Sequence, residues 1–436
     1  MSERTPFPTI FWVANLIEVL ERFAYYGIYF GFGIYMEYLG YTRAQLGIVQ
    51  SLFLFLSYIV PVVSGSFADR YGFKKVLIVS YVAYLPSILL LIFTRSFSGI
   101  ALTMLSIGLA AGVFKPLIAG TVRAVTDKTN KTLGFGVFYA MVNVGGSFGP
   151  IVAGKLRAVS WNHAFIAAAV AIGFMLLITI LFYKEPERQT DEGGGGVRLR
   201  EILTTLLEPK FGLFLLLLGL FFWLPFWAFF NLCAIYVDRN VDTARLYLDI
   251  RSAFGLLGAG FGTAVADFFS RDDGSGGRRI LGETISHTGY IIMILQVFVS
   301  RFIEKFRPLP SFMTGLLVSA VGFGILGLAH ASGASLVFLG IFFFAVGEMI
   351  SSPRIQEYIT WIAPKEKAGL YMGSNYVATA IGALLSGVTY TVFYGWVRER
   401  GHPEYVWFVL GGHLLVAVAV FLVFSRVVGE FEEREE

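Results

Sequence analysis

The sequence has few of the residues on which soluble enzymes and disulfide-linked domains depend. Its 436 residues include one cysteine, Cys233, so an intrachain disulfide is excluded. Charged residues make up only 15% of the chain, whereas apolar residues make up 56% and 43 residues are phenylalanine. A typical soluble domain has about 25% charged residues. The composition therefore excludes a soluble domain and predicts an integral membrane protein.

Residues that build catalytic or metal centres are equally sparse. The five histidines are scattered without the spacing of a metal site, at His163, His287, His330, His402 and His413. No glycine-rich phosphate loop follows a strand pattern. The net charge of +4 is small, and its basic residues are distributed over loops. We therefore expect no enzyme activity, no metal, no cofactor and no nucleic-acid partner.

Long apolar stretches are what the chain has in abundance. About twelve of them approach the roughly 20 residues that a helix needs to cross a bilayer. They lie near residues 8–36, 44–68, 76–94, 97–120, 133–156, 163–183, 211–236, 280–302, 309–330, 334–353, 368–395 and 404–427. The first ten residues lack the pattern of a cleaved signal peptide, so we expect the first helix to be kept.

A charged segment divides these spans into two sets of six. Residues 184–209 carry four consecutive glycines among charged residues, a composition typical of a flexible aqueous linker. We expect an all-α integral membrane fold of twelve transmembrane helices, with one six-helix bundle at 1–183 and a second at 210–436. Carriers built from such repeats place their substrate near the membrane midplane between them.

The basic residues predict the orientation of the chain. With the N-terminus in the cytoplasm, the loops that follow the even-numbered spans are cytoplasmic, and they carry most of the lysines and arginines, including Arg70, Lys74, Lys75, Arg123, Lys128, Lys131, Arg301, Lys305, Arg307, Lys365 and Lys367. Cytoplasmic loops are enriched in these residues. We expect both termini in the cytoplasm.

One apolar segment outside the twelve spans raises the question of an extra crossing. Residues 237–279 include AFGLLGAGFGTAVADFF, residues 253–269. A crossing there would place the later basic loops outside, against the charge bias. We therefore expect residues 237–279 to form an insert on the outer face of the second bundle.

A stripe of charge runs along the first span. In IEVLERFAYYG, residues 17–27, the side chains of Glu18, Glu21, Arg22 and Tyr25 fall within one sector of about 100° on an α-helix. A charge at the bilayer centre costs about 2.5–3.5 kcal/mol, so such residues normally face a protein interior or a water-filled path. The stripe is either a structural ion pair or a functional site, and three charges exceed what packing needs.

Two further ionisable residues lie at membrane depth. Lys115 precedes Pro116 in the fourth span, and Glu348 lies in the tenth. A cavity with basic groups from one half and an acid from the other suits a zwitterion, whose carboxylate and ammonium they would bind. Alternatively, Lys115 extends to an interface and Glu348 is a helix-end charge facing the cytoplasm. Asn143, in the fifth span, is a weaker candidate, since such residues often bond neighbouring helices.

Two motifs resemble known families. GSFADRYGFKKVL, residues 65–77, resembles the loop signature of the major facilitator superfamily. This resemblance implies that Asp69 and Arg70 hold a cytoplasmic gate and do not touch substrate. EVLERFAYYG, residues 18–27, looks like the ExxERF(x)YYG signature of the proton-dependent oligopeptide transporter family.

Three further stretches agree with the oligopeptide transporter family, in the same order along almost the whole chain: GVFKPLI (112–118), FYAMVNVGGSFGP (138–150) and GEMISSPRIQEYITWIAPKEKAGLYMG (347–373). The resemblance implies proton coupling through Glu18, Glu21, Arg22 and Lys115. It also implies a substrate site formed by Arg22, Tyr25, Tyr26, Lys115 and Glu348. The chain departs from the family at Asn231 in the seventh span, where an acidic gating residue is expected, and in the insert that follows it.

These observations favour a proton-coupled symporter that imports short peptides, or peptide-like zwitterions, by alternating access. We expect a monomer in the cell (inner) membrane, with substrate, protons and the lipid bilayer as its partners. One alternative is a carrier of the same fold for an amphipathic lipid or drug-like molecule, including an exporter. Another is a sensor or scaffold with a degenerate transporter body.

Overall fold

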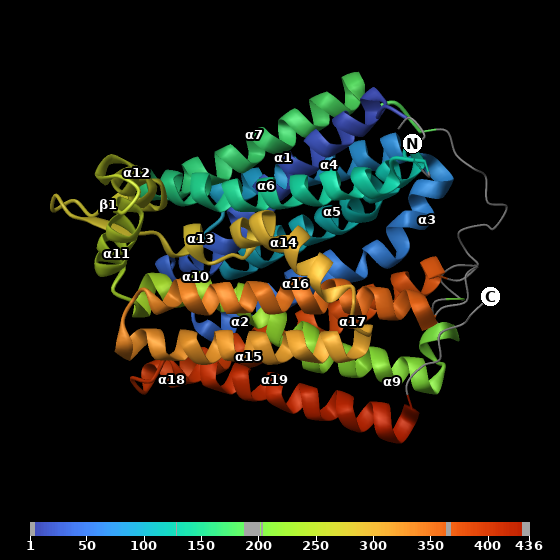
Figure 1. Cartoon of the computed structure of the whole chain (residues 1–436). Coiled ribbons are helices and arrows are strands. Elements are labelled where there is room, and N and C mark those ends of the chain that lie inside the picture. The colour runs from blue at the N-terminus through green and yellow to red at the C-terminus, as the bar shows by residue number, and fades with distance from the viewer. Residues whose placement is uncertain (1–4, 128, 187–200, 202–203, 363–367, 430–436) are drawn as a thin grey trace. The chain divides into compact units, whose positions relative to one another are not determined.

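The structure is a computed structural model that describes residues 5–127, 129–186, 201, 204–362 and 368–429. Nearly all of these residues are helical (Figure 1). The helices before the linker are α1 (Thr9–Tyr38), α2 (Arg43–Ile59), α3 (Pro61–Tyr71), α4 (Phe73–Phe93), α5 (Phe97–Ala124), α6 (Lys131–Val159) and α7 (Trp161–Phe182).

The elements after the linker are more interrupted. Three of them are π-helical segments, which are labelled η. In chain order they are α9 (Pro209–Leu218), η1 (Gly219–Trp223), α10 (Leu224–Asn240), α11 (Thr243–Gly255), α12 (Ala259–Phe269), β1 (Ser270–Asp272), β2 (Arg278–Ile280), α13 (Gly282–Ile285), α14 (Gly289–Ile303), α15 (Pro308–Ser332), α16 (Leu336–Ile362), α17 (Ala368–Ser386), η3 (Gly387–Thr391), α18 (Val392–Glu399), α19 (Tyr405–Phe424) and η4 (Ser425–Gly429).

Eleven helices of the described chain are long and apolar enough to cross a membrane. They correspond to the second to twelfth expected spans. The first expected span is α1, which is 30 residues long but carries the charged stripe. The prediction of an all-α membrane fold is therefore confirmed. Several spans are composite: residues 209–240, for example, run through α9, η1 and α10 without leaving a helical path.

Contacts between residues divide the chain into two compact units. Unit 1 contains residues 1–29 and 52–205, and unit 2 contains residues 30–51 and 206–436. Residues 30–38 at the end of α1 and the first half of α2 therefore belong to unit 2. The limits of the two bundles inferred from the sequence stay a prediction.

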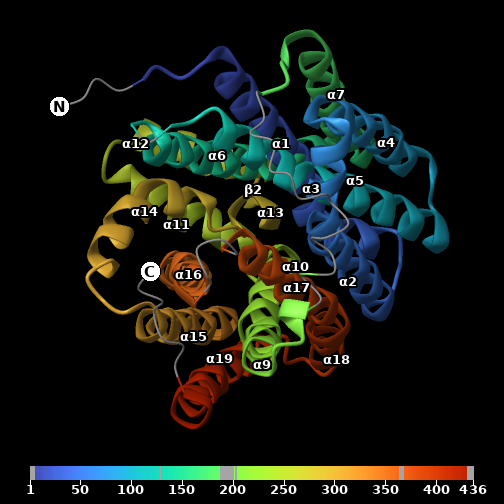
Figure 2. The ribbon, with the colours of Figure 1, turned by 90° about the vertical axis from the view of Figure 1, so that its right-hand side faces the viewer.

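Unit 1 is built around α4, which packs against α5 and α7. In unit 2, α15 lies alongside α16 and α19, as Figures 1 and 2 both show. Glycines bring α15 and α16 close together: a Cβ on Gly315 would lie 2.8 Å from the carbonyl oxygen of Gly347, and a Cβ on Gly322 would lie 2.8 Å from that of Gly340. Small residues permit such close approach of membrane helices.

The segment that follows α10 is a compact insert of α11, α12 and the antiparallel pair β1 and β2. Gly258, with φ +137°, separates α11 from α12 in a conformation that favours glycine. α11 has 13 residues and α12 has 11, so neither is long enough to cross a bilayer. The β-hairpin was not expected from the sequence. The location of the insert on the outer face stays a prediction.

Candidate functional site

The charged stripe of α1 is buried inside unit 1. Glu18 and Glu21 are 0% exposed and Arg22 is 8% exposed. The Arg22 Nε donates to Glu18 Oε1 at 2.7 Å, one helical turn away, and Arg22 Nη1 lies 3.3 Å from Glu21 Oε2. One guanidinium therefore compensates two carboxylates. Such an arrangement is stable only when the charges remain paired, because a buried unpaired charge is strongly destabilising.

The two carboxylates are not held equally. The contact between Arg22 and Glu18 is a hydrogen bond, whereas neither oxygen of Glu21 has a hydrogen-bond partner among the described residues. A buried carboxylate oxygen without a donor is unusual in folded proteins. Glu21 is therefore the more weakly held acid of the pair.

Lys115 lies on α5 in the same unit. Its side chain is 8% exposed, and its Nζ donates to the backbone oxygen of Ser57 at 3.2 Å. The ammonium also lies 3.6 Å from the ring centroid of Tyr58 and 5.1 Å from that of Tyr25, within the range of cation–π attraction. No described carboxylate lies within ion-pair distance of Lys115. The amine is thus buried among aromatic rings, and no described side chain gives it a direct counter-charge.

Glycines on α6 bring that helix against the charged part of α1. A Cβ on Gly145 would collide with the backbone of Val19, and a Cβ on Gly149 would collide with that of Phe23. These glycines belong to the motif that carries Asn143. The Asn143 side chain is half-buried, and its Nδ2 donates to the carbonyl oxygen of Tyr139 at 2.9 Å.

The structure therefore gathers most of the predicted site residues within unit 1. Tyr25 is buried, and its ring meets that of Tyr26 edge-on at 5.2 Å between centroids. Asp69 and Arg70 lie apart from this group, in the last turn of α3. Arg70 is exposed, with its guanidinium 5.2 Å from the ring centroid of Tyr71; the side chain of Asp69 lies outside the described residues. Their gating role stays a prediction.

Glu348 lies in unit 2, in the middle of α16 and not at a helix end. Its position next to Gly347 places it beside the close contact between α15 and α16. The Thr288 side chain lies close to the Glu348 carboxylate. The Oε2 atom of that carboxylate is buried and has no hydrogen-bond partner among the described residues. Glu348 thus retains one unused acceptor.

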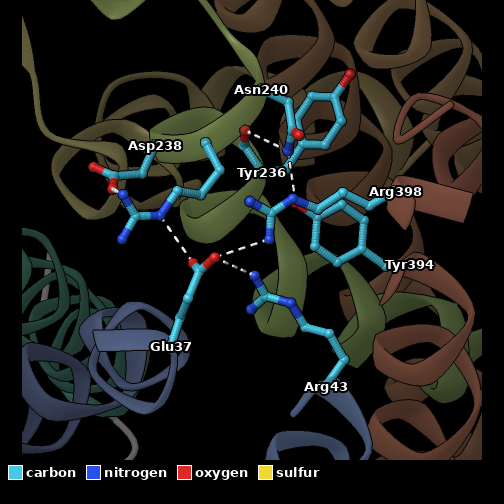
Figure 3. Close-up of polar contacts among 8 residues, drawn as sticks. Glu37, Arg43, Tyr236, Asp238, Asn240, Tyr394 and Arg398 are labelled. Atoms are coloured by element: carbon cyan, nitrogen blue, oxygen red, sulfur yellow. Dashed lines mark hydrogen bonds and ion pairs between the residues drawn. The ribbon is translucent and has the colours of Figure 1, made fainter. Parts of the chain in front are cut away.

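Unit 2 also contains a polar cluster that sequence analysis missed (Figure 3). Glu37, at the end of α1, accepts hydrogen bonds from Arg398 Nη1 at 2.8 Å and Arg239 Nε at 2.8 Å. Arg43 Nη2 lies 3.0 Å from Glu37 Oε1. One carboxylate therefore joins the end of α1 and the start of α2 to α10 and α18. Each charge lies near the end of a different span, and no spacing in the sequence links them.

Comparisons with known proteins agree on the fold and differ on the cargo. The sequence matches the family described as Major Facilitator Superfamily over residues 14–285. It is 24% identical over 364 residues to the quinolone resistance protein NorA of Staphylococcus aureus (strain MSSA476), covering 82% of this chain and 84% of that protein.

Two solved structures share the fold. A POT family transporter in complex with 5-aminolevulinic acid has a TM-score of 0.74 at 18% identity, covering 95% of this chain and 96% of that one. The nucleoside transporter NupG has a TM-score of 0.71 at 12% identity, covering 95% of this chain and 99% of that one. At these identities the likeness shows the fold alone.

Proposed function

Because the chain belongs to the major facilitator superfamily, whose members are membrane transporters and not enzymes, we propose that it is a proton-coupled symporter that imports short peptides or peptide-like zwitterions by alternating access. The match confirms the superfamily that the loop at residues 65–77 indicates. The narrower assignment to the proton-dependent oligopeptide transporters is part of this proposal, and it rests on the motif at residues 18–27 and on the charge arrangement of unit 1.

The observation that carries the proposal is the unequal hold of Arg22 on its two carboxylates. Arg22 bonds Glu18 at 2.7 Å but lies 3.3 Å from Glu21, whose oxygens have no hydrogen-bond donor in the described part of the chain. A proton that binds Glu21 breaks only a weak contact. Glu21 is therefore the proposed proton-coupling acid, with Glu18 keeping Arg22 in place.

Charge balance links this proton to a substrate. Glu18 and Glu21 together offset the charges of Arg22 and Lys115. Neutralising Glu21 leaves one buried cation uncompensated, and a buried cation requires a partner. A substrate carboxylate can supply that charge, so proton binding and substrate binding favour each other. Tyr25, a neighbour of Lys115, would line the site.

The remaining proposed contacts follow the same chemistry. Tyr26 and Asn143 would line the site beside Tyr25, and the unused acceptor of Glu348 would bind the substrate's ammonium group. A fold neighbour was solved with 5-aminolevulinic acid, which carries both an amine and a carboxylate. This neighbour supports a zwitterionic substrate for the present chain.

The proposed driving force is sufficient for nutrient uptake. One charge crossing a potential of 100 mV provides about 2.3 kcal/mol. At about 1.4 kcal/mol for each factor of ten, this sustains a substrate gradient of roughly fifty-fold. We propose that the protein works as a monomer in the cell membrane with both termini in the cytoplasm. A reporter fused to the C-terminus and active only in the cytoplasm tests the orientation.

The experiment that tests the function is uptake of labelled dialanine into proteoliposomes, with and without an inward proton gradient. We expect gradient-driven accumulation by the wild type. Glu21→Gln should lose accumulation but retain exchange of labelled for unlabelled dialanine, because the neutral side chain mimics the protonated state. Asp249→Asn, which removes a carboxylate from the partly exposed Arg245–Asp249 pair on α11, is the control and should transport normally. Accumulation by Glu21→Gln equal to that of the wild type would refute the role of Glu21.

A second candidate function is transport of an amphipathic drug-like molecule, including export. The similarity to NorA over 82% of the chain favours it. An apolar cargo without an amine has no need of Glu348. Two results together would favour this candidate over the peptide symporter: transport of a drug-like molecule that is unchanged in Glu348→Gln, and no detectable uptake of dialanine by the wild type.

A further inference from the structure

The eighth expected span is not one continuous helix. α13 ends at Ile285 and α14 begins at Gly289, so three residues lie between the two helices. Breaks of this kind in transporter helices expose polar groups at binding sites. The break lies inside unit 2, because α13 packs against α10, with Gly282 close to the backbone of Ala234.

His287 lies in this break and is 4% exposed. Its Nδ1 is 3.3 Å from the backbone nitrogen of Gly289. A backbone N–H can only donate, so Nδ1 accepts and the neutral ring carries its proton on Nε2. No described residue accepts a hydrogen bond from that Nε2. Buried polar groups are nearly always paired, so this N–H is available to a ligand.

The neighbouring residue connects His287 to Glu348. The Thr288 side chain lies close to the Glu348 carboxylate, whose Oε2 has no partner among the described residues. His287 in the break thus presents an unused donor, and Glu348, which its neighbour Thr288 approaches, presents an unused acceptor. A ligand that satisfies both atoms must carry both a hydrogen-bond donor and an acceptor.

Aromatic rings surround this polar pair. The His287 ring lies 4.4 Å from that of Tyr290 and 5.7 Å from that of Phe30, measured between centroids. Phe30 in turn meets Phe230 at 5.8 Å, and Phe230 meets Phe344 at 6.1 Å. Hydrogen bonds are stronger in apolar surroundings than in water. A ligand bound here would therefore be recognised mainly by its few polar atoms.

We propose that His287 is a specificity residue for peptide substrates, whose Nε2–H donates to the carbonyl oxygen next to the amine that Glu348 binds. In the amino-terminal residue of a peptide, one carbon atom separates the amine from that carbonyl group. The unused donor of His287 and the unused acceptor of Glu348 are chemically complementary to this carbonyl group and amine. The inference rests on the proposed function, because it takes a peptide as the substrate.

The test compares two substrates that differ in that carbonyl group. Dialanine has it, and 5-aminopentanoic acid lacks it while keeping an amine and a carboxylate at the ends of a chain of similar length. Gradient-driven uptake of each is measured in the wild type, His287→Phe and His287→Gln. Elution as a single species and thermal unfolding in detergent verify that each variant is folded.

We expect His287→Phe to raise the KM for dialanine about tenfold or more and to leave that for 5-aminopentanoic acid within about twofold of its wild-type value. His287→Gln keeps a donor and should recover most of the dialanine uptake. His413→Phe is the matched control, since both ring nitrogens of His413 have partners, Tyr390 and Leu220. This control should not change the ratio of the KM values for the two substrates.

Four outcomes would overturn the inference. An equal loss for both substrates in His287→Phe would indicate a structural role, and no change for dialanine would exclude the contact. If His287→Phe does not fold, His287→Gln decides. Because glutamine can still donate a hydrogen bond, a selective loss of dialanine uptake in this variant, as large as the loss expected for His287→Phe, would contradict donation from this position. Absence of dialanine uptake by the wild type would refute the proposed function itself and the inference with it.

Discussion

Replacement of Glu37 tests how the end of α1 and the start of α2 are held in unit 2. The Glu37 carboxylate contacts Arg398, Arg239 and Arg43 at 2.8, 2.8 and 3.0 Å. In Glu37→Gln the side chain keeps its shape but loses its charge, and three arginines are left around a neutral group. Residues 30–51 should then detach from the rest of unit 2 more often.

The size of the effect follows from the exposure of the four side chains, which are about a third exposed or less. A sheltered hydrogen bond to a charged group contributes about 1.5–3 kcal/mol, and an exposed ion pair about 0.2–1 kcal/mol. The three contacts of Glu37 are of intermediate exposure, and glutamine replaces part of each with a neutral hydrogen bond. We therefore expect Glu37→Gln to lower the free energy of detaching residues 30–51 by about 2 kcal/mol. This corresponds to roughly a thirty-fold change in the detachment equilibrium.

The assay uses a thiol placed where residues 30–51 meet η3. Ser51 is buried, and its Oγ accepts a hydrogen bond from the backbone nitrogen of Val388 at 2.9 Å. Ser51→Cys, in a protein whose native thiol is removed by Cys233→Ala, reports each detachment through its rate of labelling by a water-soluble maleimide. Labelling of a buried thiol follows the population of the open form when opening and closing are fast.

We expect the labelling rate to rise about thirty-fold when Glu37→Gln is added. Asp249→Asn, which removes a carboxylate elsewhere in unit 2, should leave the rate unchanged. A rate that changes by less than about twofold in Glu37→Gln would refute the reasoning, because it would mean that the cluster contributes nothing to holding the segment.

Three further substitutions test the packing and charge of unit 1. Arg22→Ala should destabilise the protein by about 3–5 kcal/mol, because it leaves two buried carboxylates without their cation. Thermal unfolding measures this loss of stability. If adding Glu18→Gln to Arg22→Ala recovers none of the loss, the explanation is contradicted. Gly149→Ala should cost about 1–3 kcal/mol through collision with the backbone of Phe23. Gly136→Ala, in open space on the same helix, should cost much less, and equal losses would argue against the collision. Lys115→Gln should weaken binding of dialanine about tenfold or more but leave binding of the C-terminal amide of dialanine nearly unchanged. Isothermal titration measures both affinities. An equal loss of affinity for the two ligands would exclude a contact between Lys115 and the substrate carboxylate.

Local features of the site could be predicted from the sequence because they depend on one helix. The period of an α-helix places Glu18 and Arg22 one turn apart on the same face, and the structure joins them by a hydrogen bond. The same reasoning cannot place Lys115 against Tyr58, because that contact depends on how separate helices pack. Burial could be inferred for Lys115, but its aromatic surroundings could not.

Breaks within the spans were harder to predict. Apolar composition continues through η1, so it gives no sign of a change in hydrogen bonding there. Polar residues do occur in η3 and between α13 and α14, where Ser286, His287 and Thr288 follow one another, but short polar runs also occur inside continuous helices. The hairpin of β1 and β2 did carry a signal: Gly274 and Gly276 both adopt φ +82° in the turn, and the sequence DDGSGG favours such a turn. The arginines around Glu37 gave no such signal in the sequence, because charges at span ends are ordinarily solvated.

The measurement that tests the central claim most directly is proton entry driven by substrate. Proteoliposomes containing the protein and a pH-sensitive dye are held at an inside-negative potential, and dialanine is added outside. The proposed coupling through Glu21 predicts acidification of the interior that requires dialanine, is absent with a matched uncharged solute and is lost in Glu21→Gln. Dialanine entry without acidification, or acidification that persists in Glu21→Gln, would contradict the account.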